Sequence, residues 1–262
     1  MKVIKFWKIV WSYYESEKKS NTLIIVAIWA PNLMDVDSLR NADILTKAWY
    51  DVITPEYYGF CRSEWKFTPK NSIKTLLDTK NFFKNWVIEN IYNWEKIKVK
   101  YKNFIFLWMS YWWWVVPLLP KYDKEVKNIA MFYPVVDYLS FWKRWVKEET
   151  VEDFCNSIYR GFSKIYNSIK LPIWKKQFKD ETEYIPIKNM KYMKWVNTFL
   201  AHWTEDISIY YKKTSEYYTE LKKIFPNWNI VYKEYKWFWH GFDTMEKWTY
   251  DMIKFFVQKS EK

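Results

Sequence analysis

Residues 104–113 read Phe-Ile-Phe-Leu-Trp-Met-Ser-Tyr-Trp-Trp, an apolar run that leads directly into Ser110. The apolar part has the composition of a buried strand, and the residues after Ser110 favour the start of a helix. A serine at a sharp turn between a strand and a helix is the setting of a nucleophile elbow, whose pattern is G-x-S-x-G. Tryptophan stands at the glycine positions of this pattern. With glycine at 108, 112 and 113 the segment reads G-M-S-Y-G-G.

The composition shows the same exchange of glycine for tryptophan. The chain has 262 residues, of which 3 are glycine and 20 are tryptophan, whereas average usage near ~7% predicts roughly 18 glycines. Tryptophan also follows asparagine at 85–86, 93–94 and 227–228, and Asn-Gly is the usual signal for a tight turn at such places. The tryptophans therefore occupy positions that are typical of glycine.

We interpret this pattern as a variant genetic code, in which UGA codons that mean glycine have been translated as tryptophan. An AT-rich gene fits this hypothesis, because only four of the 42 basic residues are arginine. UGG codons at 108, 112 and 113 would contradict it.

The alternative is a chain that is genuinely rich in tryptophan, with a stacking surface for sugars or bases. Energetics argue against it, since a bulky residue in a left-handed or crowded glycine site costs on the order of 1–3 kcal/mol. About ten such sites or more would exceed a total stability of ~5–15 kcal/mol.

Length and charge indicate a single α/β domain over 1–262, because no linker rich in Ser, Gly or Pro divides the chain. The net charge of +12 comes from lysines spread along the chain, which favours a solvated surface over nucleic-acid binding. The apolar stretch 104–119 contains Pro117 and is shorter than the ~20 residues of a membrane helix. The N-terminus has no signal-peptide pattern, and Cys61 and Cys155 have no metal or redox spacing. We therefore expect a cytoplasmic protein that binds neither nucleic acid nor a membrane.

Apolar runs and helical periodicity alternate along the chain, which predicts a mostly parallel sheet. Strands are predicted at 8–14, 22–28, 50–55, 104–107, 128–133, 196–201 and 229–235. Helices are predicted at 36–48, 71–85 and 249–258. The segment 137–195 leans towards helix and breaks the alternation, so we interpret it as an insertion that acts as a lid or binding loop.

A serine nucleophile needs a base, and the chain has two histidines. His240 follows the last predicted strand, in a loop that reads G-F-G-H-G-F with glycine restored, and we assign it as the base. His202 directly follows the preceding predicted strand, and we expect it to pack or hydrogen-bond locally. Asp206, four residues later, is the candidate for orienting His240, with Glu205 as the fallback acid.

The expected reaction is acyl transfer to water. His240 takes the proton from Ser110 as the serine oxygen attacks an ester or amide carbonyl, and water then releases the acyl-enzyme. The backbone N–H of Tyr111 lies next to the start of the predicted helix, where it can stabilise the oxyanion. This chemistry requires no metal and no cofactor. The substrate class is a small ester, an amide or a short peptide, and the sequence leaves the particular compound open.

The chain order Ser110, Asp206, His240 is that of α/β-hydrolases. The sequence resembles the prolyl oligopeptidase-like (serine peptidase S9) and dienelactone-hydrolase-like branches of that superfamily, since G-M-S-Y-G-G is similar to the G-x-S-Y-G-G of the S9 group. Residues 48–65, read as A-G-Y-D-V-I-T-P-E-Y-Y-G-F-C-R-S-E-G, resemble the D-Y-R-G-x-G-x-S-x-G strand-and-loop segment of α/β-hydrolases. The restored stretches F-L-A-H-G-T-E-D at 199–206 and Y-K-G-F-G-H-G-F at 235–242 carry the C-terminal part of the resemblance.

This resemblance implies an α/β-hydrolase fold, with a mostly parallel central sheet flanked by helices and the insertion 137–195 as a helical lid. Many relatives have His-Gly after the third strand, where this sequence has Ile28-Trp29 followed by Ala30-Pro31. Ala30 is therefore the residue that could give a second oxyanion N–H, because proline has none.

Two other uses of the same fold remain open. The chain could be a catalytically silent α/β-hydrolase-fold binding protein, or an acyltransferase that passes the acyl group to an alcohol. A basic, aromatic-rich protein that binds nucleic acid or a membrane surface would follow only if the tryptophans are real.

Overall fold

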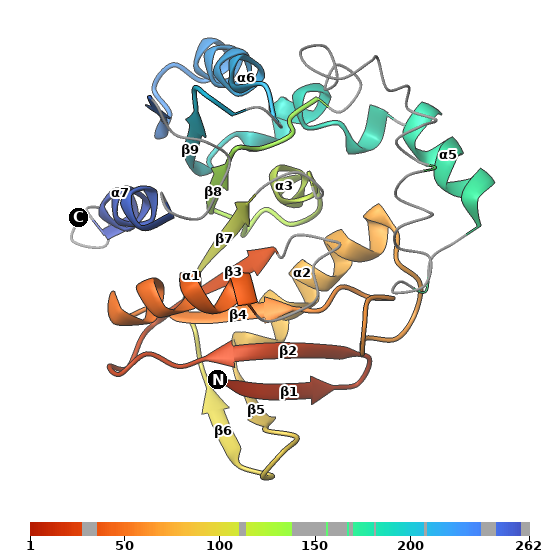
Figure 1. The fold of residues 1–262 in the computed structure, drawn as a ribbon, viewed down its shortest axis with the longest axis vertical. Coiled ribbons are helices and arrows are strands. Elements are labelled where there is room, and N and C mark those ends of the chain that lie inside the picture. The colour runs from red at the N-terminus through yellow and green to blue at the C-terminus, as the bar shows by residue number, and fades with distance from the viewer. Residues whose placement is uncertain are drawn as a thin grey trace.

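The computed structural model describes residues 1–27, 36–109, 114–137, 156, 167, 170–180, 182–206, 209–236 and 245–257. Within these residues one sheet has the strand order β1-β2-β4-β3-β7-β8-β9-β10 (Figure 1). Its strands are β1 Lys2–Phe6, β2 Ile9–Tyr14, β3 Thr22–Ala27, β4 Asp51–Pro55, β7 Asn103–Met109, β8 Asn128–Phe132, β9 Asn197–Trp203 and β10 Ile230–Tyr235. A separate hairpin of β5 Trp86–Glu89 and β6 Lys96–Val99 projects from the bottom of the molecule in Figure 1.

Helices flank this sheet. They are α1 Val36–Lys47, α2 Pro69–Phe83, α3 Leu119–Tyr122, α5 Leu171–Asp180, α6 Tyr211–Ile224 and α7 Met245–Val257, with the 3₁₀ turns η1 Val116–Leu118, η2 Thr182–Tyr184 and η3 Pro186–Met193. Helices α1 and α7 pack on each other, α2 packs on β3 and β4, and α6 packs on β9 and β10.

From β4 to β10 the neighbouring strands of the sheet are parallel, and the β1–β2 hairpin joins β4 antiparallel at one side. Strand β3 lies between β4 and β7, with Ile25 opposite both Ile53 and Phe106. All of β3 after Thr22 is buried, as expected of a central parallel strand that is covered on both faces. Its sequence is therefore a continuous apolar run, and the predicted class, a mostly parallel sheet flanked by helices, is confirmed.

Every predicted strand is present, with bounds that differ by one to two residues at most ends. Strand β1, the β5–β6 hairpin and α6 were not predicted. Lysine interrupts the apolar residues of β1 and β6, and β5 is only four residues long and partly exposed. These strands therefore lack the long apolar runs used for prediction. Helix α6 buries Thr214, Tyr217 and Leu221, and polar residues such as lysine and glutamate fill most of its other positions, so few strongly apolar residues mark it.

The described residues of the apolar stretch 104–119 include most of strand β7, the turn η1 and the first residue of α3. This agrees with its interpretation as a strand and a turn rather than a membrane span. In the part of the chain that the structure describes, no helix combines the length and the apolar character needed to cross a membrane. Between β8 and β9 the described residues contain α5, η2 and η3, which fall within the proposed insertion.

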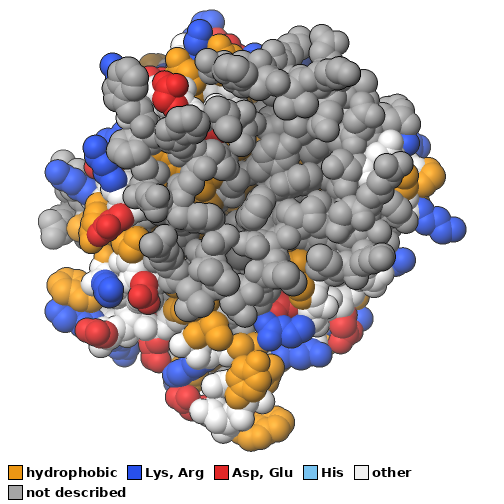
Figure 2. Space-filling view, in the orientation of Figure 1, with side chains coloured by type: hydrophobic (Ala, Val, Ile, Leu, Met, Phe, Trp, Pro, Cys, Tyr) orange, Lys and Arg blue, Asp and Glu red, His pale blue; other side chains and the backbone are white. Residues whose placement is uncertain are grey.

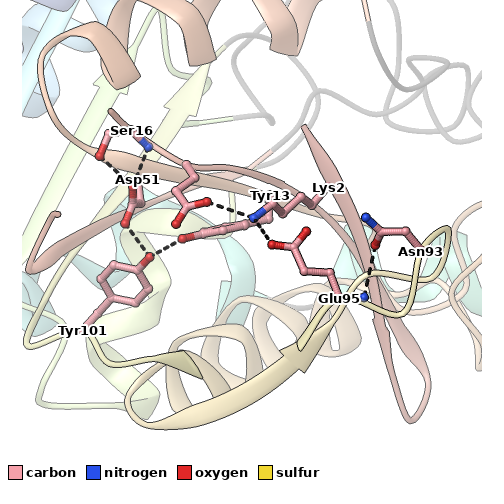
Figure 3. Close-up of polar contacts among 8 residues, drawn as sticks. Lys2, Tyr13, Ser16, Asp51, Asn93, Glu95 and Tyr101 are labelled. Atoms are coloured by element: carbon pink, nitrogen blue, oxygen red, sulfur yellow. Dashed lines mark hydrogen bonds and ion pairs between the residues drawn. The ribbon is translucent and has the colours of Figure 1, made fainter. Parts of the chain in front are cut away.

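A buried polar network ties the amino ends of β4 and β7 to β2 (Figure 3). The Asp51 carboxylate, 5% exposed, accepts hydrogen bonds from the backbone N–H of Ser16 at 2.7 Å and from its hydroxyl at 2.8 Å. The Tyr101 hydroxyl donates to the other Asp51 oxygen at 2.5 Å and lies 2.6 Å from the Tyr13 hydroxyl. Burial raises the pKa of both phenols. Because the Tyr101 hydroxyl donates its single proton to Asp51, Tyr13 is the donor to Tyr101. Every group in the network has a partner.

We expect Asp51→Ala to lower the free energy of unfolding by about 2–4 kcal/mol, because it leaves buried donors of Ser16 and Tyr101 without an acceptor. Urea denaturation followed by circular dichroism measures this. Asp43→Ala is the control, since its carboxylate is 73% exposed and pairs only weakly with Lys47, so the change there should stay below about 0.5 kcal/mol. Equal losses for the two variants would contradict a structural role of the network.

Charge of both signs is mixed over the described part of one face, where lysine and acidic side chains lie next to each other (Figure 2). Hydrophobic side chains gather at the end of the molecule that the β5–β6 hairpin forms. The exposed large side chains there are Trp86, Val87, Tyr92 and Trp94. The apolar character of this end thus depends in part on two tryptophans that follow asparagine.

Candidate active site at the carboxyl edge of the sheet

The carboxyl ends of the parallel strands share one edge of the sheet, and this edge is the usual location of sites in open α/β folds. At the end of β3, Ala27 pairs with Trp108 of β7. At the end of β9, Trp203 pairs with Tyr235, the last residue of β10. Segments that follow β3, β7, β9 and β10 therefore all leave the sheet on the same side.

Most of the predicted site residues follow these strand ends but lie outside the described residues. Ser110 and Tyr111 come directly after β7, Ala30 comes shortly after β3, and His240 comes shortly after β10. Their roles stay predictions. The structure does describe the strands from which they emerge, and it describes Asp206.

Asp206 follows β9 and is 1% exposed. One carboxylate oxygen accepts the backbone N–H of Ile209 at 2.8 Å, and the other lies 3.2 Å from Nε2 of His202. A carboxylate has about four lone-pair sites and can therefore accept more than two hydrogen bonds. A buried, oriented carboxylate at the carboxyl edge of a sheet can hold the ring of a neighbouring histidine in one tautomer.

His202 lies within β9 and is buried. Its Nε2 faces two acceptors, the Asp206 carboxylate and the carbonyl of Ile209 at 3.1 Å, while Nδ1 lies 2.7 Å from the hydroxyl of Thr214. Nε2 therefore carries a proton, and Nδ1 can accept from the threonine. This confirms the expectation that His202 is hydrogen-bonded locally. Thr214 was missed as its partner because α6, on which it lies, was not predicted.

The loop 56–65 follows β4 and is held by several buried hydrogen bonds. Glu56 is fully buried, and its carboxylate accepts hydrogen bonds from the backbone N–H of Arg62 at 2.7 Å and from the guanidinium Nε at 2.6 Å. Ser63 accepts from the backbone N–H of Val10 and donates to the carbonyl of Glu56. The only sequence signal was the resemblance of 56–65 to the α/β-hydrolase segment. These contacts hold the loop at the carboxyl end of β4, against Val10 of β2.

Three or more His, Cys, Asp or Glu side chains do not come together as a possible metal site anywhere in the described residues.

No protein-family model matches the chain, and no curated protein matches it. Solved structures do match. Est1E from Butyrivibrio proteoclasticus has a TM-score of 0.62 at 10% identity, over 99% of this chain and 98% of that one. MGS-MChE2, an alpha/beta hydrolase enzyme from the metagenome of sediments of the Mar Chica lagoon, has a TM-score of 0.62 at 13% identity, over 98% of this chain and 99% of that one.

A putative dipeptidyl aminopeptidase IV from Bacteroides ovatus has a TM-score of 0.63 at 10% identity, over 95% of this chain and 33% of that one. At such low identities these likenesses concern the fold. The parallel sheet, its flanking helices and the coverage of nearly the whole chain together lead to one conclusion. The protein has the α/β-hydrolase fold.

Proposed function

We propose that the protein is a serine hydrolase, which cleaves an ester or amide bond through an acyl-enzyme with Ser110 as nucleophile, His240 as base and Asp206 as the carboxylate that orients His240. The observation that carries the proposal is the shared carboxyl edge: the strands before these residues end on the same side of the sheet. In addition, Asp206 is a buried, hydrogen-bonded carboxylate directly after β9. Several structures of the same fold are named as esterases or hydrolases.

The proposed mechanism follows from what each group does. His240 accepts the serine proton, and the serine oxygen then attacks the carbonyl carbon. The N–H groups of Tyr111 and Ala30 donate to the oxyanion of the tetrahedral intermediate. His240 returns the proton to the leaving alcohol or amine, and the same steps with water release the acid.

The elbow in this proposal requires small residues at 108 and 112, because its turn packs closely against the neighbouring strand and helix. We therefore propose that the active protein carries glycine there, and that UGA codons have been translated as tryptophan. The S9-like branch is part of the same proposal and rests on the reading G-M-S-Y-G-G. We further propose that the insertion 137–195 caps the site and screens a small ester, amide or short peptide.

The test compares the chain as written with a glycine variant, in which glycine replaces tryptophan at positions 49, 65, 86, 94, 108, 112, 113, 203, 228, 237 and 239. Both are treated with a fluorophosphonate probe, which reacts with activated serines, and the labelled peptide is mapped by mass spectrometry. We expect label on Ser110 in the glycine variant alone. A well-folded glycine variant without label would contradict the proposal and favour a silent binding protein. An added alcohol that captures the acyl group in preference to water would indicate an acyltransferase.

A further inference from the structure

Backbone conformation gives an independent view of which tryptophans are out of place. In the described residues, positive φ angles occur at seven residues other than glycine, and five of these are tryptophan; the other two are Cys61 and Tyr133. The tryptophans are Trp7 (φ 52°), Trp49 (65°), Trp65 (79°), Trp94 (59°) and Trp195 (71°). Asn and Asp, the residues that most often adopt this conformation besides glycine, do not occur among the seven. A bulky side chain is the least suited to it.

Trp49 occupies the glycine position of a Schellman motif at the end of α1. The backbone N–H of Tyr50 donates to the carbonyl of Leu45 at 3.1 Å, and the N–H of Trp49 donates to the carbonyl of Thr46 at 3.0 Å. This pair of hydrogen bonds defines the motif, in which the residue at Trp49 is left-handed and is usually glycine.

Trp195 occupies the glycine position of a type II turn between η3 and β9. Lys194 has φ −58° and ψ 129°, which are the angles of the second residue of such a turn. The N–H of Val196 donates to the carbonyl of Met193 at 3.2 Å and closes it. The third residue of a type II turn needs a positive φ, and therefore glycine or asparagine.

Trp7 and Trp94 lie in hairpin loops. Trp7 and Lys8 form the two-residue connection of β1 and β2, since Phe6 pairs with Ile9. The φ angle is positive at Trp7 and not at Lys8, which is the pattern of a type II′ turn with glycine first. Trp94 follows Asn93 in the loop between β5 and β6, where the sequence Asn-Gly is favoured.

Trp65 shares a loop with a real glycine in the same conformation. Gly59 has φ 78°, and a Cβ there would lie 2.1 Å from the backbone nitrogen of Phe67. Asn167 joins both ends of this loop: its N–H donates to the Gly59 carbonyl at 2.8 Å, and its side-chain amide donates to the Trp65 carbonyl at 2.5 Å. In the α/β-hydrolase segment that this loop resembles, Gly59 and Trp65 both stand at glycine positions.

Four of the five tryptophan rings are mostly exposed, whereas Trp65 is partly buried and packs against Tyr58. The exposed fractions are 59% for Trp7, 55% for Trp49, 73% for Trp94 and 57% for Trp195. Burial of these rings therefore does not offset the steric cost of the backbone.

We infer that the native protein carries glycine at 7, 49, 65, 94 and 195, encoded by UGA. Positions 7 and 195 are inferred from their backbone conformation alone, because no sequence motif marks them. The inference goes beyond the proposed function, because it concerns residue identity at turns and helix ends and holds whether or not Ser110 is reactive.

The direct test is the protein purified from its source organism and digested with trypsin. The peptide 48–62 contains Trp49 as its single tryptophan, and it should have the mass of the glycine form; the peptides that contain positions 7, 65, 94 and 195 should show the same exchange. The gene should have UGA at all five codons. Tryptophan masses in these peptides, or UGG codons, would overturn the inference.

The melting temperature of the tryptophan-containing chain and its variants gives a second test. Each single Trp→Gly substitution at positions 7, 49, 94 and 195 should raise the melting temperature by about 1–4 °C, because strain in the left-handed region is relieved and little ring burial is lost. Trp11→Gly is the control: Trp11 is fully buried, lies in β2 without a positive φ, and its indole N–H donates to the hydroxyl of Thr79 at 2.8 Å. It should lower the melting temperature. Losses at the four positions as large as that of the control would contradict the inference.

Discussion

Ser110→Ala in the glycine variant should lower kcat/KM for ester hydrolysis by about 10⁴-fold to 10⁶-fold and leave the melting temperature unchanged. The size follows from the role of the hydroxyl, since without it no acyl-enzyme forms and the oxyanion groups alone contribute a residual rate. Steady-state hydrolysis of a p-nitrophenyl ester measures the loss. Ser110 follows the last residue of β7 in the sequence, so removal of its hydroxyl leaves the described strands of the sheet unchanged.

Ser20→Ala is the control for this variant. Ser20 lies just before β3, at the amino edge of the sheet, and its hydroxyl donates to the carbonyl of Thr22. The two substitutions remove the same group at opposite ends of parallel strands, so only Ser110→Ala should affect the rate. Undiminished hydrolysis by Ser110→Ala would remove this serine from the mechanism. Equal losses of kcat/KM in the two variants would indicate a folding defect.

The central strands could be predicted because parallel strands buried on both faces read as continuous apolar runs. Residues 23–27 and 104–107 are of this kind, and both form strands where expected. Strand β1 and the hairpin at 86–99 could not be predicted in this way, because lysine interrupts the apolar residues of β1 and β6, and β5 is only four residues long and partly exposed. The Asp51 network was also out of reach, since it joins residues up to 88 positions apart through contacts that only the fold creates.

The candidate site was predictable in outline for a topological reason. Ser110, Asp206 and His240 were assigned by their places after strands, and parallel strands bring such places to one edge. What the sequence could not indicate is the environment of Asp206. His202 and the N–H of Ile209 bind the same carboxylate, and the spacing of four residues from His202 to Asp206 gave no sign of this contact, because β9 ends between them.

Sequence motifs and backbone conformation both support the hypothesis that glycine is the native residue at many tryptophan positions. Asn-Trp pairs, the elbow segment and the hydrolase-like segment 48–65 suggested it from sequence, and the left-handed tryptophans suggest it from the backbone. The two sets overlap at 49, 65 and 94 but neither contains the other. A residue inside a strand, such as Trp108, has no positive φ to mark it, and a turn such as 193–196 has no motif.

Asp206→Asn in the glycine variant should lower kcat by about 10⁴-fold at neutral pH, because an amide can hold the ring of His240 in the wrong tautomer and no longer stabilises its charged form. In the proposed mechanism Asp206 acts through His240 and is thus a positioning residue. The pH dependence of kcat/KM should change along with the rate, since the pKa of the base depends on its carboxylate partner. The amide should also cost some stability, because its NH₂ group would face the donor of His202 or of Ile209.

Two controls separate positioning from structure. His202→Gln disturbs the same buried cluster, with the loss of contacts to Asp206 and Thr214, yet it should keep kcat per folded molecule. Glu205→Gln changes the neighbouring exposed carboxylate, the fallback acid, and should leave both rate and stability nearly unchanged. If His202→Gln and Asp206→Asn reduced kcat equally, Asp206 would have a structural role only. If Glu205→Gln lowered kcat and Asp206→Asn did not, the orienting carboxylate would be Glu205. The buried Asp206 would then stabilise the end of β9.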